Sequence, residues 1–127
     1  MQIEAMCART SILVVDDDPA FRSIVQEALE DDGLMVDAAS DGQQAMALAT
    51  ARPPALVVLD WGMPLADGGM VASQLRGFLG DELPVLLITA DGRAAQKARQ
   101  ANAYAYLHKP LDVDTLVATV RRGLARS

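Results

Sequence analysis

Short apolar runs alternate with amphipathic stretches five times along this chain, and this alternation constrains the fold more than any other feature. The apolar runs are residues 12–15, 35–39, 56–59, 85–88 and 104–107. Three of them are almost uninterrupted in apolar character, which is typical of parallel strands covered on both faces. The run at 35–39 is more mixed, so we expect it at an edge of the sheet.

The stretches between the runs have helical periodicity. The first helix is expected to begin with Asp18 as N-cap and Pro19 as first residue, and to end at Asp32-Gly33, where glycine can adopt a left-handed conformation. Its expected core face consists of Phe21, Ile24, Val25, Ala28 and Leu29. Further helices are predicted at about 42–51, 69–78 and 93–101, and from Asp112 onward.

The predicted helix at 93–101 offers mostly alanine to the core. Its expected core positions are Ala94, Ala95, Ala98 and Ala101. Because alanine buries little area, we expect this helix to be the least firmly held element.

The alternation of strands and helices, without hairpin signals, predicts right-handed crossovers and a parallel sheet with helices on both faces. We therefore expect a doubly wound α/β domain over residues 11–125, preceded by a leader at 1–10. In such sheets, ligands bind beyond the carboxyl ends of the strands.

Composition excludes several classes of function. The net charge of -6 argues against direct binding to nucleic acid or to an anionic membrane. Cys7 is the only cysteine, which suits a reducing compartment. No apolar run approaches the roughly 20 residues that a bilayer span needs, and residues 1–4 lack signal-peptide character. We expect a soluble, cytoplasmic protein.

Polar residues gather where the strands are predicted to end. They are Asp16, Asp17 and Asp18, then Asp60, Thr89, His108 and Lys109. Crowded carboxylates repel each other unless a cation intervenes, and hard oxygen ligands suit Mg²⁺ with space for a phosphate oxygen. An ammonium and a hydroxyl opposite them could bind the other oxygens of a phosphoryl group. The pattern indicates phosphoryl transfer onto a carboxylate.

These residues stand in segments that resemble the receiver domains of two-component response regulators, the chemotaxis-type receiver family, from about Ser11 to Ala125. The matching segments are residues 12–18, 59–64, 67–68, 88–90 and 106–110. The resemblance implies a flavodoxin-like fold with a five-stranded parallel sheet, strand order 2-1-3-4-5, and five helices.

The resemblance also implies a metal site and a phosphoacceptor. Asp60 would accept the phosphoryl group. Asp17, Asp60 and the backbone carbonyl of Gly62 would bind Mg²⁺ (or Mn²⁺) directly, and Asp16 would hold the ion through water.

Further roles follow from the same resemblance. Thr89, Ala90 and Lys109 would contact the phosphoryl group, and the bond before Pro110 would be cis. Thr89 and Tyr106 would form the switch, with Tyr106 rotating as Thr89 turns inward. The face formed by the fourth helix, the fifth strand and the fifth helix would then change.

The sequence departs from the family pattern at Gly62, where many relatives carry a polar or larger side chain. Gly62 and Asp91 are therefore hypothesised to set the lifetime of the phosphoryl group. Two residues near the predicted site also have interpretations without a functional role. Tyr106 could be a simple packing residue, and His108 is interpreted as structural or exposed.

Three functions are considered. The leading one is a signalling switch, not an enzyme with turnover, phosphorylated by a histidine kinase or a histidine phosphotransfer protein. It would act on a downstream protein partner or on an output domain missing from this chain, and a homodimer is possible. The alternatives are a Mg-dependent phosphohydrolase, which would place its nucleophile on the first strand, and an unphosphorylated receiver-like scaffold.

Overall fold

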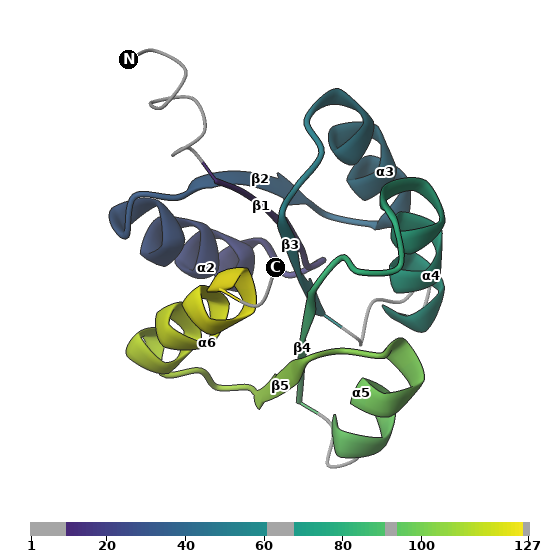
Figure 1. Ribbon diagram of the computed structural model, residues 1–127. Helices are drawn as coiled ribbons and strands as arrows, with labels where there is room; N and C mark the ends of the chain where they lie inside the picture. The colour runs from purple at the N-terminus through teal and green to yellow at the C-terminus, as the bar shows by residue number, and fades with distance from the viewer. Residues whose placement is uncertain (1–9, 61–67, 91–93, 126–127) are drawn as a thin grey trace.

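A parallel sheet lies at the centre of the computed structural model, which describes residues 10–60, 68–90 and 94–125 (Figure 1). Within these residues the sheet has five strands in the order β2-β1-β3-β4-β5. The strands are β1 Ser11–Val15, β2 Met35–Ala39, β3 Leu56–Asp60, β4 Val85–Thr89 and β5 Ala105–His108. The predicted doubly wound fold and strand order are confirmed, and the mixed strand β2 lies at an edge.

Helices cover both faces of this sheet. Their bounds are α2 Pro19–Asp31, α3 Gly42–Ala51, α4 Gly68–Leu79, α5 Ala94–Ala101 and α6 Val113–Ala125. Figure 1 shows α2 and α6 together on one face, with α3, α4 and α5 on the other. The predicted helix and strand bounds differ from these by one residue in several places, which is the usual uncertainty of element ends.

The side chains of each inner strand alternate between two buried clusters because successive residues of a strand point to opposite faces. In β1, Leu13 and Val15 belong to the cluster under α3 and α4, whereas Ile12 and Val14 belong to the cluster under α2 and α6. Both faces are apolar, so the inner strands read as continuous apolar runs.

The two ends of α2 agree with the sequence prediction. The side chain of Asp18 accepts hydrogen bonds from the backbone N–H groups of Ala20 and Phe21. Gly33 follows the helix with a φ of 89°, which glycine adopts without a Cβ penalty. At α6, Asp112 is the cap and not the first helical residue: its carboxylate accepts a hydrogen bond from the N–H of Thr115 at 3.0 Å.

Two positions predicted for the core are exposed. Ile24 is 53% exposed, because α2 packs onto the sheet through Val25 and Leu29 and Ile24 is rotated from them toward solvent. Ala95 is also exposed, since burial within α5 is confined to Ala98 and Ala101, in its second half, among the side chains described. The prediction that α5 buries little area is supported.

Tyr104 lies just before β5 and not within it. Its hydroxyl donates a hydrogen bond to the backbone carbonyl of Thr119 at 2.8 Å. A Cβ at Gly123 would overlap the Tyr104 ring and would lie 2.6 Å from a methyl group of Leu56. Glycine at this position therefore allows α6 to approach the sheet closely.

No helix in the described part of the chain is long and apolar enough to cross a membrane.

Candidate functional site

The carboxyl ends of β1 and β3 bring two aspartates side by side. These strands are neighbours in parallel register, with Val15 opposite Leu59, so Asp16 and Asp60 occupy the next matched positions. Both aspartates are buried, with 2% and 6% of their surfaces exposed. Strand alternation directs both side chains toward the face covered by α2 and α6.

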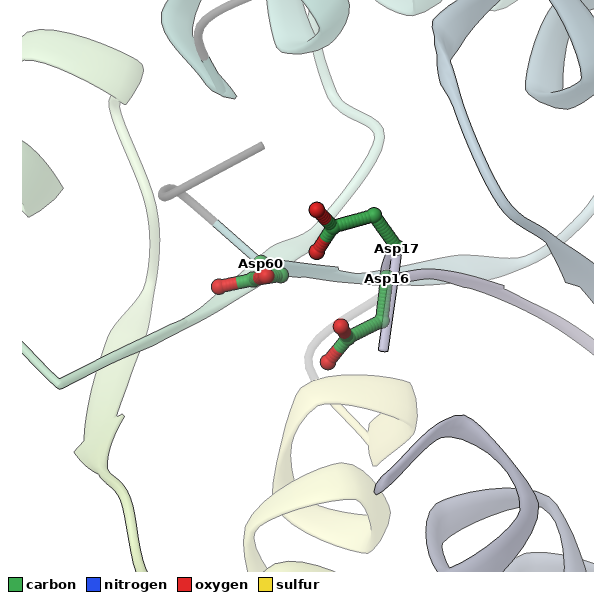
Figure 2. A group of neighbouring side chains, drawn as sticks. All are labelled: Asp16, Asp17 and Asp60. Carbon is green, nitrogen blue, oxygen red and sulfur yellow. The ribbon is translucent and has the colours of Figure 1, made fainter. Parts of the chain in front are cut away.

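Asp17 completes a group of three carboxylates with Asp16 and Asp60 (Figure 2). Each residue offers one oxygen, and these oxygens all lie within 4.8 Å of one another. Asp17 is exposed, whereas the other two are buried, so the group opens to solvent on one side. A donor set of carboxylate oxygens with an open side is suited to a hard divalent cation.

The Asp16 carboxyl group has a perturbed acidity. Burial raises its pKa from the ordinary value of 3.8 to about 6, and the nearby charge of Asp60 adds to the rise. A hydrogen bond from the N–H of Asp18, 2.9 Å from Oδ1 of Asp16, acts against this rise. Crowding of buried carboxylates makes the site receptive to a cation.

Lys109 supplies the positive charge of the site. Its Nζ lies 3.4 Å from Oδ2 of Asp16 and 3.6 Å from Oδ2 of Asp60. The backbone N–H of Lys109 donates a hydrogen bond to the carbonyl of Thr89 at 3.0 Å, which continues the pairing of β4 and β5 past the strand end. The peptide bond between Lys109 and Pro110 is cis.

The predicted switch residues share one face of two neighbouring strands. Leu87 pairs with Tyr106, and Thr89 pairs with His108, so Thr89 and Tyr106 are diagonal neighbours on the side of α5. Thr89 is buried, Ala90 is exposed, and Tyr106 is 43% exposed. His108 is exposed, with its ring centroid 6.0 Å from that of Tyr106.

Two predicted site residues, Gly62 and Asp91, lie outside the described residues. The carbonyl ligand and the lifetime hypothesis attached to them stay predictions.

Two residues at the site were not identified as functional from the sequence. The guanidinium of Arg22 donates a hydrogen bond to the backbone carbonyl of Asp16 at 2.7 Å. Phe21 was interpreted from the sequence only as a core residue, and the centroid of its ring lies 4.3 Å from Nζ of Lys109. The sequence did contain a signal for these two residues. Both stand in the first turn of the helix that follows the acidic end of the first strand, which places them beside the site.

The family model of the response regulator receiver domain matches residues 12–121. The chain belongs to this family. The receiver domain is 41% identical over 118 residues to the response regulator MprA of Mycolicibacterium vanbaalenii and 40% identical to MprA of Mycobacterium tuberculosis. Each match covers 91% of this chain and 51% of the relative, so the chain spans about half the length of these curated relatives.

Solved receiver structures have the same fold as this receiver domain. The receiver domain of NtrX from Brucella abortus has a TM-score of 0.84 and 33% identity, and the match covers 91% of this chain and 99% of that one. The chemotaxis protein CheY4 of Vibrio cholerae has a TM-score of 0.84 and 29% identity, covering 91% and 98% of the two chains. The family predicted from the sequence is therefore confirmed.

Proposed function

We propose that this receiver domain accepts a phosphoryl group on Asp60 and that this modification is its signalling event. The observation that carries the proposal is the position of the Lys109 ammonium, 3.4 and 3.6 Å from the carboxylates of Asp16 and Asp60. A carboxylate nucleophile, acidic neighbours and an opposing cation form a site suited to binding a phosphoryl group.

The residues present fit a divalent cation. Asp16, Asp17 and Asp60 would hold Mg²⁺ or Mn²⁺, together with the backbone carbonyl of Gly62, as the family resemblance implies. When bound, the ion would neutralise charge on the phosphoryl oxygens. Without a cation, the carboxylates of Asp16, Asp17 and Asp60 would repel an approaching phosphoryl group.

The transfer step proceeds on Asp60. One carboxylate oxygen of Asp60 attacks phosphorus in line with the leaving nitrogen of a phosphohistidine. The new P–O bond forms as the P–N bond breaks, and the donor imidazole leaves with the electron pair. Lys109 would pair with one phosphoryl oxygen, Thr89 would donate a hydrogen bond to another, and small Ala90 would leave the pocket open.

The conformational change would begin at Thr89 and continue to Tyr106. The two residues are diagonal neighbours on the face covered by α5, and α5 buries little area there. Inward movement of Thr89 would make space for the Tyr106 ring, so the new anion would shift a population between two packings of α5, β5 and α6.

The partners proposed here are a histidine kinase or histidine phosphotransfer protein as phosphodonor, and a downstream protein or output domain as receiver of the signal. The domain would take and lose its own phosphoryl group without turning over a separate substrate, and so would not be an enzyme in that sense. The Mg-dependent phosphohydrolase remains the competing function.

The test is phosphorylation of the purified chain by a small phosphodonor, such as acetyl phosphate, in the presence of Mg²⁺. We expect one phosphoryl group per chain by intact mass spectrometry, labile to hydroxylamine as an acyl phosphate is. Beryllofluoride should change the fluorescence of Trp61, the only tryptophan.

Asp60→Asn is the matched control, and it should abolish both responses while leaving the fold intact. A label on another residue, or an unlabelled wild-type protein, would contradict the proposal. Repeated turnover of a phosphate monoester without stoichiometric labelling would instead support the phosphohydrolase.

A further inference from the structure

The ammonium of Lys109 is bounded by an aromatic ring as well as by carboxylates. Its Nζ lies 4.3 Å from the centroid of the Phe21 ring, within the range in which a cation is attracted to the face of an aromatic system. The side chain of Lys109 is 22% exposed, so much of its surface is already removed from water. Partial desolvation strengthens a cation–π contact.

The ammonium forms ion pairs with both carboxylates, at distances longer than a short charge-assisted hydrogen bond. Charge-assisted hydrogen bonds between N and O are typically about 2.7–2.9 Å long, whereas Lys109 Nζ lies 3.4 Å from Asp16 and 3.6 Å from Asp60. It therefore lies between the two carboxylates and interacts with both. A lysine side chain has several rotatable bonds, so a third contact restricts the end of the side chain further than the two ion pairs alone.

Phe21 is placed by local structure to provide that contact. It belongs to the first turn of α2, and its backbone N–H donates to the capping carboxylate of Asp18 at 3.4 Å. Its ring also packs on the apolar cluster beneath α2 and α6. Strand alternation directs Asp16, Asp60 and Lys109 toward this same face, so the ring and the charged groups meet there.

We infer that Phe21 is a positioning residue for Lys109, holding the ammonium between Asp16 and Asp60 where an incoming phosphoryl oxygen would meet it. This inference rests on the proposed function of Asp60 and adds a residue to it. Phe21 acts through Lys109 and does not itself touch the phosphoryl group. Leucine at position 21 would keep the apolar packing but lose the negative face of the ring, while tyrosine would keep that face.

The test compares Phe21→Leu and Phe21→Tyr with Phe78→Leu. Phe78 is the other phenylalanine; it lies on α4 and is half exposed, so its replacement by leucine measures the general cost of removing a ring. The first readout is the NMR shift of the Lys109 ε-protons in the metal-free protein, which the ring current of Phe21 should move upfield. The second is the rate of phosphorylation by acetyl phosphate with saturating Mg²⁺.

Phe21→Leu should remove the upfield shift and slow phosphorylation by about 3- to 10-fold, the range expected for one cation–π contact. Phe21→Tyr should retain both properties, and Phe78→Leu should change neither. An unchanged ε-proton shift in Phe21→Leu would overturn the inference, as would a normal rate when the shift is lost. If the wild-type chain takes no phosphoryl group, the proposed function fails, and the inference fails with it. If the wild-type chain is phosphorylated normally and the Phe21 variants behave like it, only the inference fails.

Discussion

Asp16 is a deeply buried member of the acidic group that it forms with Asp17 and Asp60. The residue is 2% exposed, and burial raises the pKa of its carboxyl group to about 6. The free energy of the metal-free protein therefore depends on whether this group carries a proton. The proposed cation would offset the cost of this negative charge, so its binding would be linked to the protonation of Asp16.

The first prediction concerns the stability of the metal-free protein between pH 4 and pH 7. The pKa of Asp16 is higher in the folded state than its ordinary value of 3.8, so the folded state binds the proton more tightly. Stability from this group is fully present below pH 3.8 and is lost as pH rises toward 6, by up to roughly 3 kcal/mol. Urea unfolding at several pH values should show this decline.

Asp16→Asn is the control, because asparagine does not titrate while the other carboxylates still do. The variant should lose less stability over that pH range than the wild type. Mg²⁺ should raise the melting temperature of the wild type more at pH 7 than at pH 5. Identical pH slopes in the two proteins would show that Asp16 does not titrate in this range.

Helix α5 packs on the sheet through few of its own described side chains. Its described buried residues are two alanines, yet its C-terminal end is held by a residue from α4. The guanidinium of Arg76 donates hydrogen bonds to the carbonyl oxygens of Ala101, Asn102 and Leu83. Ala101 is the last residue of α5 and Asn102 follows it, and carbonyls at a helix end lack partners within the helix, so Arg76 acts as a cap supplied by a neighbouring helix.

The second prediction is that Arg76→Met loosens α5 selectively. Methionine keeps much of the apolar stem but removes the hydrogen bonds, so the opening free energy of α5 should fall by about 1–3 kcal/mol. Native-state hydrogen exchange of the α5 amides measures this directly. Arg99→Met, at an exposed site on α5 itself, is the control and should leave exchange nearly unchanged. Equal exchange rates of the α5 amides in the two variants would show that Arg76 does not cap this helix.

At the scale of the whole molecule, one sheet is shared by two apolar clusters. Leu29 of α2 is fully buried on one face and Leu75 of α4 is fully buried on the other. Both clusters take their inner side chains from the same strands, so neither can be lost while the other remains intact. The two layers therefore form one cooperative unit.

The third prediction is that Leu29→Ala and Leu75→Ala each destabilise the entire domain. Each substitution should lower the free energy of unfolding by about 2–5 kcal/mol, through lost burial and the cavity left behind. Trp61 fluorescence and far-UV circular dichroism should report one coincident urea transition in both variants. Separate transitions, with one face unfolding before the other, would contradict this view of the fold.

Much of the fold was predictable because its signals are local. Strand and helix periodicities are carried by neighbouring residues, and so are the Asp18 cap and the left-handed Gly33. The prediction of core residues was wrong at Ile24 and Ala95. Both fit the apolar pattern of their helix but face solvent, because a helix buries only the part of its apolar face that meets the sheet.

The amino-acid sequence by itself determined which residues stand at the carboxyl edge of the sheet, because each follows directly on an apolar run, and the order of its motifs identified the family. Only the tertiary structure decided that Phe21 faces Lys109 and that Arg76 caps α5. These contacts join elements far apart along the chain, and their distances depend on how each helix packs against the sheet. No local sequence pattern encodes the position of a helix on the sheet, because this position results from the packing of both apolar clusters together.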